Sequence, residues 1–289
     1  MFFIFLRKCV QYFQIKIQGE KMENCAFVDI FTTQNDLYGK NNCPIQFCCE
    51  VFTNKEIFDY DVLFKPERRK IFNIIPDEEI SIPGFINSGF KTEDIKTSDF
   101  NGIELSEALN NIYKLLTTFK QKNFFIIGYN HIKYDIEILN AHFKRILNLE
   151  PIIFEDKYVI DLMKVAENRI SIDKIWSYSM ESVYTYLTKD CNVYKSLRMN
   201  KSTATDIKIT KLIFKEFFNE YMSLSEISEK IREVQNVDVL NFGKYKGAKI
   251  EYVFENDKQY CAWLTKNKDI IKQNKKLIEK ILSLYNIVE

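Results

Sequence analysis

The sequence predicts an α/β fold in which a mixed β-sheet is flanked by helices. Strand-like segments come first, at 25–33, 44–52 and 57–66, and their short connections indicate an antiparallel meander. Helical and strand-like segments then alternate, an order that is typical of strands joined by helices. The C-terminal stretch has a pattern of its own and predicts a small α+β module.

The elements after the meander follow from hydrophobic spacing. Residues 71–101 contain several Pro and Gly and predict a long surface connection. Two short apolar runs, FFIIG at 124–128 and VIDLM at 159–163, predict buried strands. A polar loop is expected up to residue 202. Apolar residues at helical spacing predict helices at 105–119, 133–147, 180–187, 204–218 and 223–234, and a lysine-rich helix at the end.

The 289 residues divide into four predicted parts. Residues 22–220 form the α/β domain, 221–236 a helical linker, and 237–289 the C-terminal module. Two interpretations of residues 1–21 stay open. They form either an extension upstream of a start at Met22 or an additional strand, since apolar and polar residues alternate there.

Composition excludes several classes of protein. The formal net charge of +1 provides no global basic field, so any nucleic-acid binding must be local. Seven cysteines without a C-x-x-C pair, beside only two histidines, indicate reduced core residues and a cytoplasmic or nuclear protein that is not secreted. Because no apolar run approaches the roughly 18 residues of a membrane helix, no membrane partner is expected.

Three aspartates are candidate metal ligands. Asp29 interrupts the apolar segment CAFVDIFTT, and a buried carboxylate is costly unless a cation or a hydrogen-bond donor meets it. Asp135 and Asp206 lie near helix starts and on the inward faces of their helices. Capping of free N–H groups is the alternative, and it is strongest for Asp206. Inward carboxylates joined by Mg²⁺ or Mn²⁺ would suit phosphodiester hydrolysis.

Three motifs carry a family resemblance. FVDIFTT, GYNHIKYDIEIL and KSTATDIKITKLIF, in this order, resemble the motifs of the DEDD 3′-5′ exonucleases, of the DNA polymerase III epsilon and exodeoxyribonuclease X type, over residues 24–218. The resemblance implies an RNase H-like fold, two magnesium ions held by four acids, and a fifth residue that orients the attacking water. By position, Asp29, Asp135 and Asp206 match three of these acids. Asn130 matches a family asparagine near the site and is an expected nucleic-acid contact.

Two family positions are changed. Phe31 stands where the resemblance implies the second acid, and Lys201 where it implies the general-base histidine. The expected catalytic set is therefore Asp29, Asp135, Asp206 and Lys201. A positioned general base contributes roughly 10²- to 10⁴-fold to a rate, and a charged lysine is a poor base, so weak or lost activity is expected. Asp29 is expected to meet one residual Mg²⁺ or Mn²⁺ ion, or Lys201 itself.

The C-terminal segment FGKYKG, followed by YCAWL, resembles a small module found behind some exodeoxyribonuclease X-like proteins. Lys244, Tyr245 and Lys246 interleave basic and aromatic side chains on a glycine turn, which can hold a phosphate backbone and stack a base. Tyr260 and Trp263 are expected in the core of the module, with base stacking as the alternative.

The two histidines complete the candidate residues. His142 lies on an amphipathic helix and is expected to be structural. His131, next to Asn130, has a ligand or substrate contact as the minor alternative to a structural role.

Two hypotheses of function follow. The first is a magnesium-dependent 3′-5′ exonuclease, acting on DNA or RNA, in which another acid substitutes for Phe31. The second is a catalytically inactive module, derived from an exonuclease, that binds single-stranded nucleic-acid ends or a protein partner. The three aspartates favour the first, whereas Phe31 and Lys201 favour the second. An acid from another segment beside Asp29 and Asp206 would discriminate between them.

Overall fold

A computed structural model describes residues 23–34, 42–55, 60–171, 174–199, 201–218, 222–234, 240, 242–246 and 248–288. The predicted N-terminal extension, residues 1–21, lies outside the described residues. Within the described part of the chain, no helix is both long enough and apolar enough to cross a membrane.

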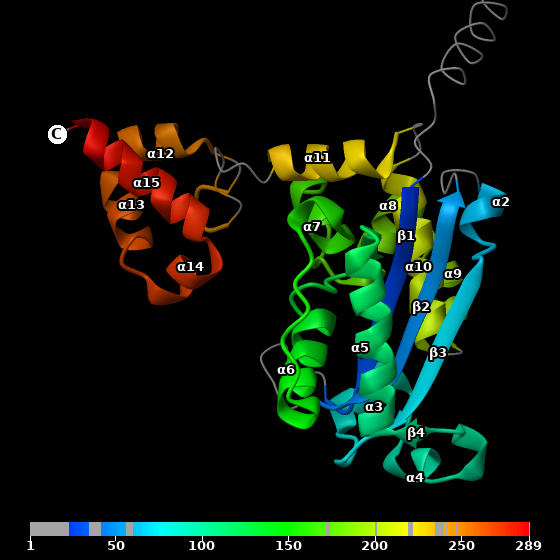
Figure 1. Cartoon of the computed structure of the whole chain (residues 1–289). Helices are drawn as coiled ribbons and strands as arrows, with labels where there is room; N and C mark the ends of the chain where they lie inside the picture. Colours follow the sequence, from blue (N-terminus) through cyan, green and yellow to red (C-terminus); the bar gives the residue numbers. More distant parts are fainter. Residues whose placement is uncertain are drawn as a thin grey trace, which may run out of the picture.

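A mixed sheet forms the centre of the molecule, as the sequence predicts (Figure 1). Its strand order is β4-β3-β2-β1-β5-β6, with β1 antiparallel to β2 and parallel to β5. β1 is thus an inner strand with partners on both sides. The strands are β1 (Glu23–Thr32), β2 (Pro44–Lys55), β3 (Arg68–Ile75), β4 (Ile103–Glu104), β5 (Phe125–Gly128) and β6 (Val159–Asp161).

Helices cover both faces of the sheet. α5 (Leu105–Gln121) and α6 (Asp135–Leu147) pack on the face that carries Ala26, Val28 and Ile30 of β1. On the other face lie α7 (Leu162–Arg169), α8 (Met180–Thr188) and α10 (Thr203–Phe217), together with Cys25 and Phe27. Because side chains alternate along a strand, Asp29 points to the α10 face.

One predicted strand is wrong. In place of a strand at 57–66, the described residues contain a short helix, α2 (Tyr60–Leu63), and the third strand of the meander is β3, which begins at Arg68. Pro66 explains the shift, since proline has no N–H to donate to a strand ladder. The strand therefore begins after it, with its first four residues exposed.

Two predicted connections contain helices. The segment 71–101 holds the end of β3, α3 (Ile82–Ser88), α4 (Thr92–Ile95) and a 3₁₀ turn, Ser98–Phe100. The predicted loop before residue 202 holds α9 (Cys191–Arg198), which Asp190 caps by accepting the N–H groups of Asn192 and Val193. Of the six cysteines in the described residues, all are free thiols and only Cys191 is exposed.

The C-terminal residues pack around a hydrophobic cluster of their own that includes Ile250, Val253, Leu264 and Ile281. Figure 1 shows these helices beside the α/β part, beyond α11 (Leu224–Val234). The β component predicted for this module is limited, in its described residues, to a bridge at Lys249. The helices are α12 (Ile250–Asn256), α13 (Lys258–Leu264), α14 (Lys268–Gln273) and α15 (Lys275–Val288).

Gly84 sets how closely α3 approaches the end of β1. The carbonyl oxygen of Thr33 accepts the backbone N–H and the hydroxyl of Ser81, each at 2.9 Å, and a Cβ at Gly84 would collide with that same carbonyl. Gly84→Ala is therefore expected to lower the free energy of unfolding by about 1–3 kcal/mol, measured by urea denaturation.

The matched control for this substitution is Ile82→Ala on the same helix. Ile82 is 76% exposed, so its removal should change stability by less than about 0.5 kcal/mol. Equal urea midpoints for the two variants would refute this role of Gly84.

Candidate functional site

Three aspartates from three elements meet at one end of the sheet. Asp29 lies on β1, Asp135 begins α6, and Asp206 lies in the first turn of α10. Burial raises the pKa of Asp29 well above its usual range, and the charges of Asp206 and Asp135 raise it further. The pKa of Asp135 is raised by burial and by the charges of Asp161 and Asp206. The structure therefore brings these three predicted site residues into one electrostatic cluster.

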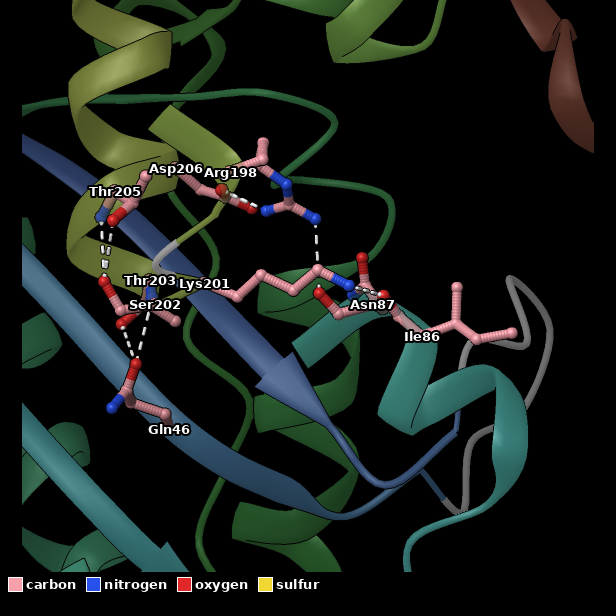
Figure 2. Close-up of polar contacts among 9 residues, drawn as sticks. All are labelled: Gln46, Ile86, Asn87, Arg198, Lys201, Ser202, Thr203, Thr205 and Asp206. Carbon is pink, nitrogen blue, oxygen red and sulfur yellow. Dashed lines mark hydrogen bonds and ion pairs between the residues drawn. The ribbon is translucent and has the colours of Figure 1, made fainter. Parts of the chain in front are cut away.

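The first turn of α10 is fixed to the sheet, and this places Asp206. Gln46 of β2 accepts the backbone N–H and the hydroxyl of Thr203, each at 2.9 Å (Figure 2). Ser202 caps the helix by accepting the N–H of Thr205 at 3.1 Å. Asp206 is thereby held with its side chain toward the sheet, as its spacing with buried Thr210 and Ile213 predicts.

Arg198, the last residue of α9, contacts this cluster directly. Its Nη1 forms an ion pair with Asp206, and its Nη2 donates to the carbonyl oxygen of Asn87 at 3.2 Å (Figure 2). The pKa of Asp206 is raised by burial, against the lowering effect of Arg198. Sequence reasoning missed Arg198 because the segment that carries it was predicted to be a loop.

The two changed family positions have other partners. Phe31 is buried at 1% exposure, so the second acid is replaced by an apolar side chain. Lys201 donates its Nζ to the carbonyl oxygen of Ile86 in α3. Lys201 thus meets Ile86 rather than Asp29, although its positive charge lowers the pKa of Asp206. Among the described residues of the cluster, the ion pair is that of Arg198 with Asp206.

The carboxylates fit a single divalent cation better than two. Buried Oδ2 atoms of Asp29 and Asp135 have no hydrogen-bond partner among the described residues, which leaves two oxygen ligands available. However, no group of three His, Cys, Asp or Glu side chains in the described part of the chain has the spacing of a metal site. Because Arg198 holds Asp206, the buried carboxylate oxygens without a hydrogen-bond partner among the described residues are Oδ2 of Asp29, of Asp135 and of Asp161, the last 3.7 Å from Nδ1 of His131.

Asn130 and His131 lie on the strand-to-helix turn before α6. Asn130 adopts a positive φ of 60° and donates its backbone N–H to Oδ1 of Asp161 at 2.9 Å. His131 is fully buried, with Nδ1 3.7 Å from Oδ2 of Asp161, and burial lowers its pKa. Both contacts shape the turn, and the expected nucleic-acid contact of Asn130 stays a prediction.

His142 occupies a buried position within its own helix, consistent with the expected structural role. It is fully buried on α6, and its Nδ1 lies 2.9 Å from the carbonyl oxygen of Ile138.

The glycine turn of the C-terminal module is held by contacts within the module and by one contact with the α/β part. Asp257 accepts Lys244 Nζ at 2.8 Å and the hydroxyl of Tyr245 at 2.9 Å. Lys246 Nζ reaches the hydroxyl of Tyr178 in the α/β part, at 2.9 Å. Gly243 has a φ of 69°, and a Cβ there would collide with the hydroxyl of Tyr260. The nucleic-acid contacts expected of Lys244, Tyr245 and Lys246 stay predictions.

Trp263 is more exposed than expected. Its ring stacks on Tyr260 with centroids 5.6 Å apart, but the residue is 51% exposed. The predicted core position of Trp263 is therefore wrong. Its accessible ring face keeps base stacking as the alternative.

Comparisons with known proteins address both parts of the chain. Residues 240–269 match the family model described as exodeoxyribonuclease X-like C-terminal. A comparison with curated proteins finds no significant match.

Solved structures of E. coli exonuclease I share the fold of the larger part. One, described as suggesting how processivity is achieved, has 15% identity over 75% of this chain and 46% of that chain, with a TM-score of 0.54. A complex with a dA16 oligonucleotide has 16% identity over the same shares, with a TM-score of 0.54. A zinc-bound complex with single-stranded DNA has 14% identity over 71% and 42%, with a TM-score of 0.51.

The similarity thus spans less than half of the exonuclease I chains. At these identities it shows the fold, which is the mixed α/β architecture predicted from the sequence. The family-model match is confined to residues 240–269, and the exonuclease I structures show the fold of the chain alone.

Proposed function

We propose that this chain binds the 3′ ends of single-stranded DNA at the aspartate cluster and hydrolyses them slowly or not at all. The observation that carries the proposal is the ion pair of Arg198 with Asp206. In addition, the apolar Phe31 stands where the resemblance implies the second acid. The exonuclease I structures of the same fold, solved with DNA oligonucleotides, support the choice of ligand.

The side chains present suit a strand end. Oδ2 of Asp29 and Oδ2 of Asp135 are buried without a hydrogen-bond partner among the described residues, so a terminal 3′-hydroxyl that entered the cluster could donate to them, a donor that an internal nucleotide lacks. Nη1 and Nη2 of Arg198 already donate to Asp206 and to the carbonyl oxygen of Asn87, and the N–H groups that remain on the guanidinium can donate to the last phosphodiester. Arg198 thus supplies a cation of the protein's own, and end binding should need no divalent ion.

A divalent cation between Asp29 and Asp135 would, when bound, lower the pKa of its water and stabilise the leaving oxygen. Apart from such an ion, the chain offers few groups that could assist hydrolysis. Phe31 contributes no ligand. Lys201 donates to the carbonyl oxygen of Ile86, so its amine is not positioned to act as a general base. These substitutions account for slow or absent hydrolysis.

An active 3′-5′ exonuclease is the second candidate. The free Oδ2 atoms of Asp29 and Asp135 favour it, since unsatisfied buried carboxylate oxygens are suited to a metal ion. Asp161 is a further acid whose charge acts on Asp135. Its Oδ1 caps α7, and its buried Oδ2 has no hydrogen-bond partner among the described residues. Among the described residues, the acids whose charges raise the pKa of Asp29 are Asp206 and Asp135, and neither is the substitute expected for Phe31.

The test uses a 5′-labelled single-stranded DNA with Mn²⁺. Wild type is expected to release nucleotides no more than roughly 10²-fold faster than the Asp29→Ala background, because a positioned general base is missing. Release by wild type that exceeds this background by far more would overturn the slow-hydrolysis proposal in favour of the active exonuclease.

End binding is tested separately, by competition in the same buffer with EDTA. A linear single strand is expected to displace a labelled strand better than a circular one of equal length, because only the linear strand has a 3′-hydroxyl. Equal displacement by the two would overturn the end-binding proposal.

A further inference from the structure

A recess of about 430 Å³ lies beside α10, on the side of the helix that faces β2 and β3. Its walls come from α10, from β3 and from the segment after α2. The lining residues are Phe64, Arg69, Ala204, Thr205, Lys208 and Lys211. Three of the six are cations, and none is an acid.

The acid behind this recess is Glu50 of β2, which is 1% exposed. Arg69, opposite Glu50 in the strand register, donates Nε and Nη2 to Oε1 at 2.7 and 2.6 Å. Lys211, 2% exposed, donates its Nζ to Oε2. One carboxylate thus faces two cations, and Lys208 adds a third at the mouth, so the recess carries excess positive charge.

The buried part of this positive charge, that of Lys211, is placed where water screens it poorly. Lys211 is buried against the rings of Phe52 and Phe64, with its Nζ 5.9 and 5.0 Å from their centroids. Electrostatic attraction is stronger in such a low-dielectric setting than at an open surface. Arg69 is half exposed, so an entering anion can reach its guanidinium without displacing the buried pair.

We propose that this recess binds a phosphate group, and that in a bound strand it holds a phosphodiester upstream of the 3′ end. The part about the strand rests on the proposed function, whereas binding of free phosphate does not. Thr205 and Lys208 of the recess flank Asp206 along the first turns of α10, so both sites belong to one short stretch of helix. A tetrahedral anion with several acceptor oxygens matches donors that converge from two elements.

The strand test measures the affinity of a labelled 12-nucleotide DNA against salt concentration for wild type, Lys208→Ala and Lys120→Ala. Lys120 is an exposed lysine on α5, which covers the other face of the sheet, so the control removes the same charge. Lys208→Ala is expected to weaken binding roughly fivefold or more and to lower the log–log salt slope by about 0.7, the value for one single-strand phosphate contact. Lys208→Arg should retain the affinity.

A second arm measures the rise in melting temperature that inorganic phosphate produces at constant ionic strength. A rise in wild type and Lys120→Ala that is lost in Lys208→Ala supports the site for the free anion, even if the chain binds no DNA. A strand effect of Lys208→Ala without such a rise supports the phosphodiester as ligand. Equal behaviour of the two lysine variants in both arms would overturn the proposal.

Discussion

Glu50→Ala is expected to lower the free energy of unfolding by about 3–5 kcal/mol, because it leaves buried charges without their partner. Glu50 is the carboxylate that receives both Arg69 and Lys211, on a strand in the interior of the sheet. Arg69 is half exposed and can turn to water, but Lys211 is 2% exposed and cannot. Urea denaturation at neutral pH measures the loss.

The pH dependence of Glu50→Ala follows from Lys211. Burial already lowers the pKa of Lys211, and Glu50 opposes that shift, so removing Glu50 lowers the pKa further. Between this lowered pKa and the ordinary pKa of an unfolded lysine, the unfolded chain binds more protons than the folded one. The stability of Glu50→Ala should therefore rise with pH across that window.

Two controls test whether the loss of stability comes from leaving a buried charge without its ion-pair partner. Glu155 pairs with Lys157 at 2.8 Å, with both side chains about half exposed or more, so Glu155→Ala should cost less than about 1 kcal/mol. The double variant Glu50→Ala with Lys211→Met should recover most of the loss, since no buried charge remains. A loss of less than about 1 kcal/mol in Glu50→Ala would contradict this description of the pair.

Arg198→Leu is expected to raise the affinity for Mn²⁺ by about tenfold or more, because it removes a cation that competes for Asp206. Freed from its ion pair, Asp206 adds a third carboxylate to those of Asp29 and Asp135. Titration of Mn²⁺, followed by its electron paramagnetic resonance signal, measures the change without any enzymatic readout.

The matched control is Lys195→Leu, which removes one positive charge from an exposed position of the same helix, α9. Its Mn²⁺ affinity should stay within about twofold of wild type, since screening by water weakens long-range effects of exposed charges. If the two variants bind Mn²⁺ equally, Arg198 does not compete with the ion.

Much of the fold could be predicted from the sequence, because its signals are local. The apolar run FFIIG predicted β5, which pairs in parallel with β1, and helical spacing predicted α5, α6 and α10 close to their observed bounds. The third strand was misplaced because the alternation before Pro66 looked like a strand, although the ladder forms only after that proline. Short helices such as α9 depend on tertiary packing more than on pattern.

The site was predicted in part. Asp29 is predictable because a carboxylate inside an apolar run is costly to bury without a partner. Glu50 in PIQFCCEVF gives the same signal, which could have revealed its buried ion pairs. Arg198 gives no such signal, because an arginine in a polar stretch is ordinarily solvated. Its role depends on α9, which places it beside Asp206 and within hydrogen-bond distance of the carbonyl oxygen of Asn87, and the spacing of residues in the sequence does not reveal this arrangement.

The central claim is that Arg198 supplies the cation at which a 3′ end binds. The most direct measurement is the dissociation constant of a labelled linear single-stranded DNA, with and without EDTA, for wild type and Arg198→Leu. We expect the wild-type affinity to be unchanged by EDTA and the variant to lose affinity in EDTA. Loss of wild-type binding on chelation, or undiminished binding by Arg198→Leu in EDTA, would contradict the claim.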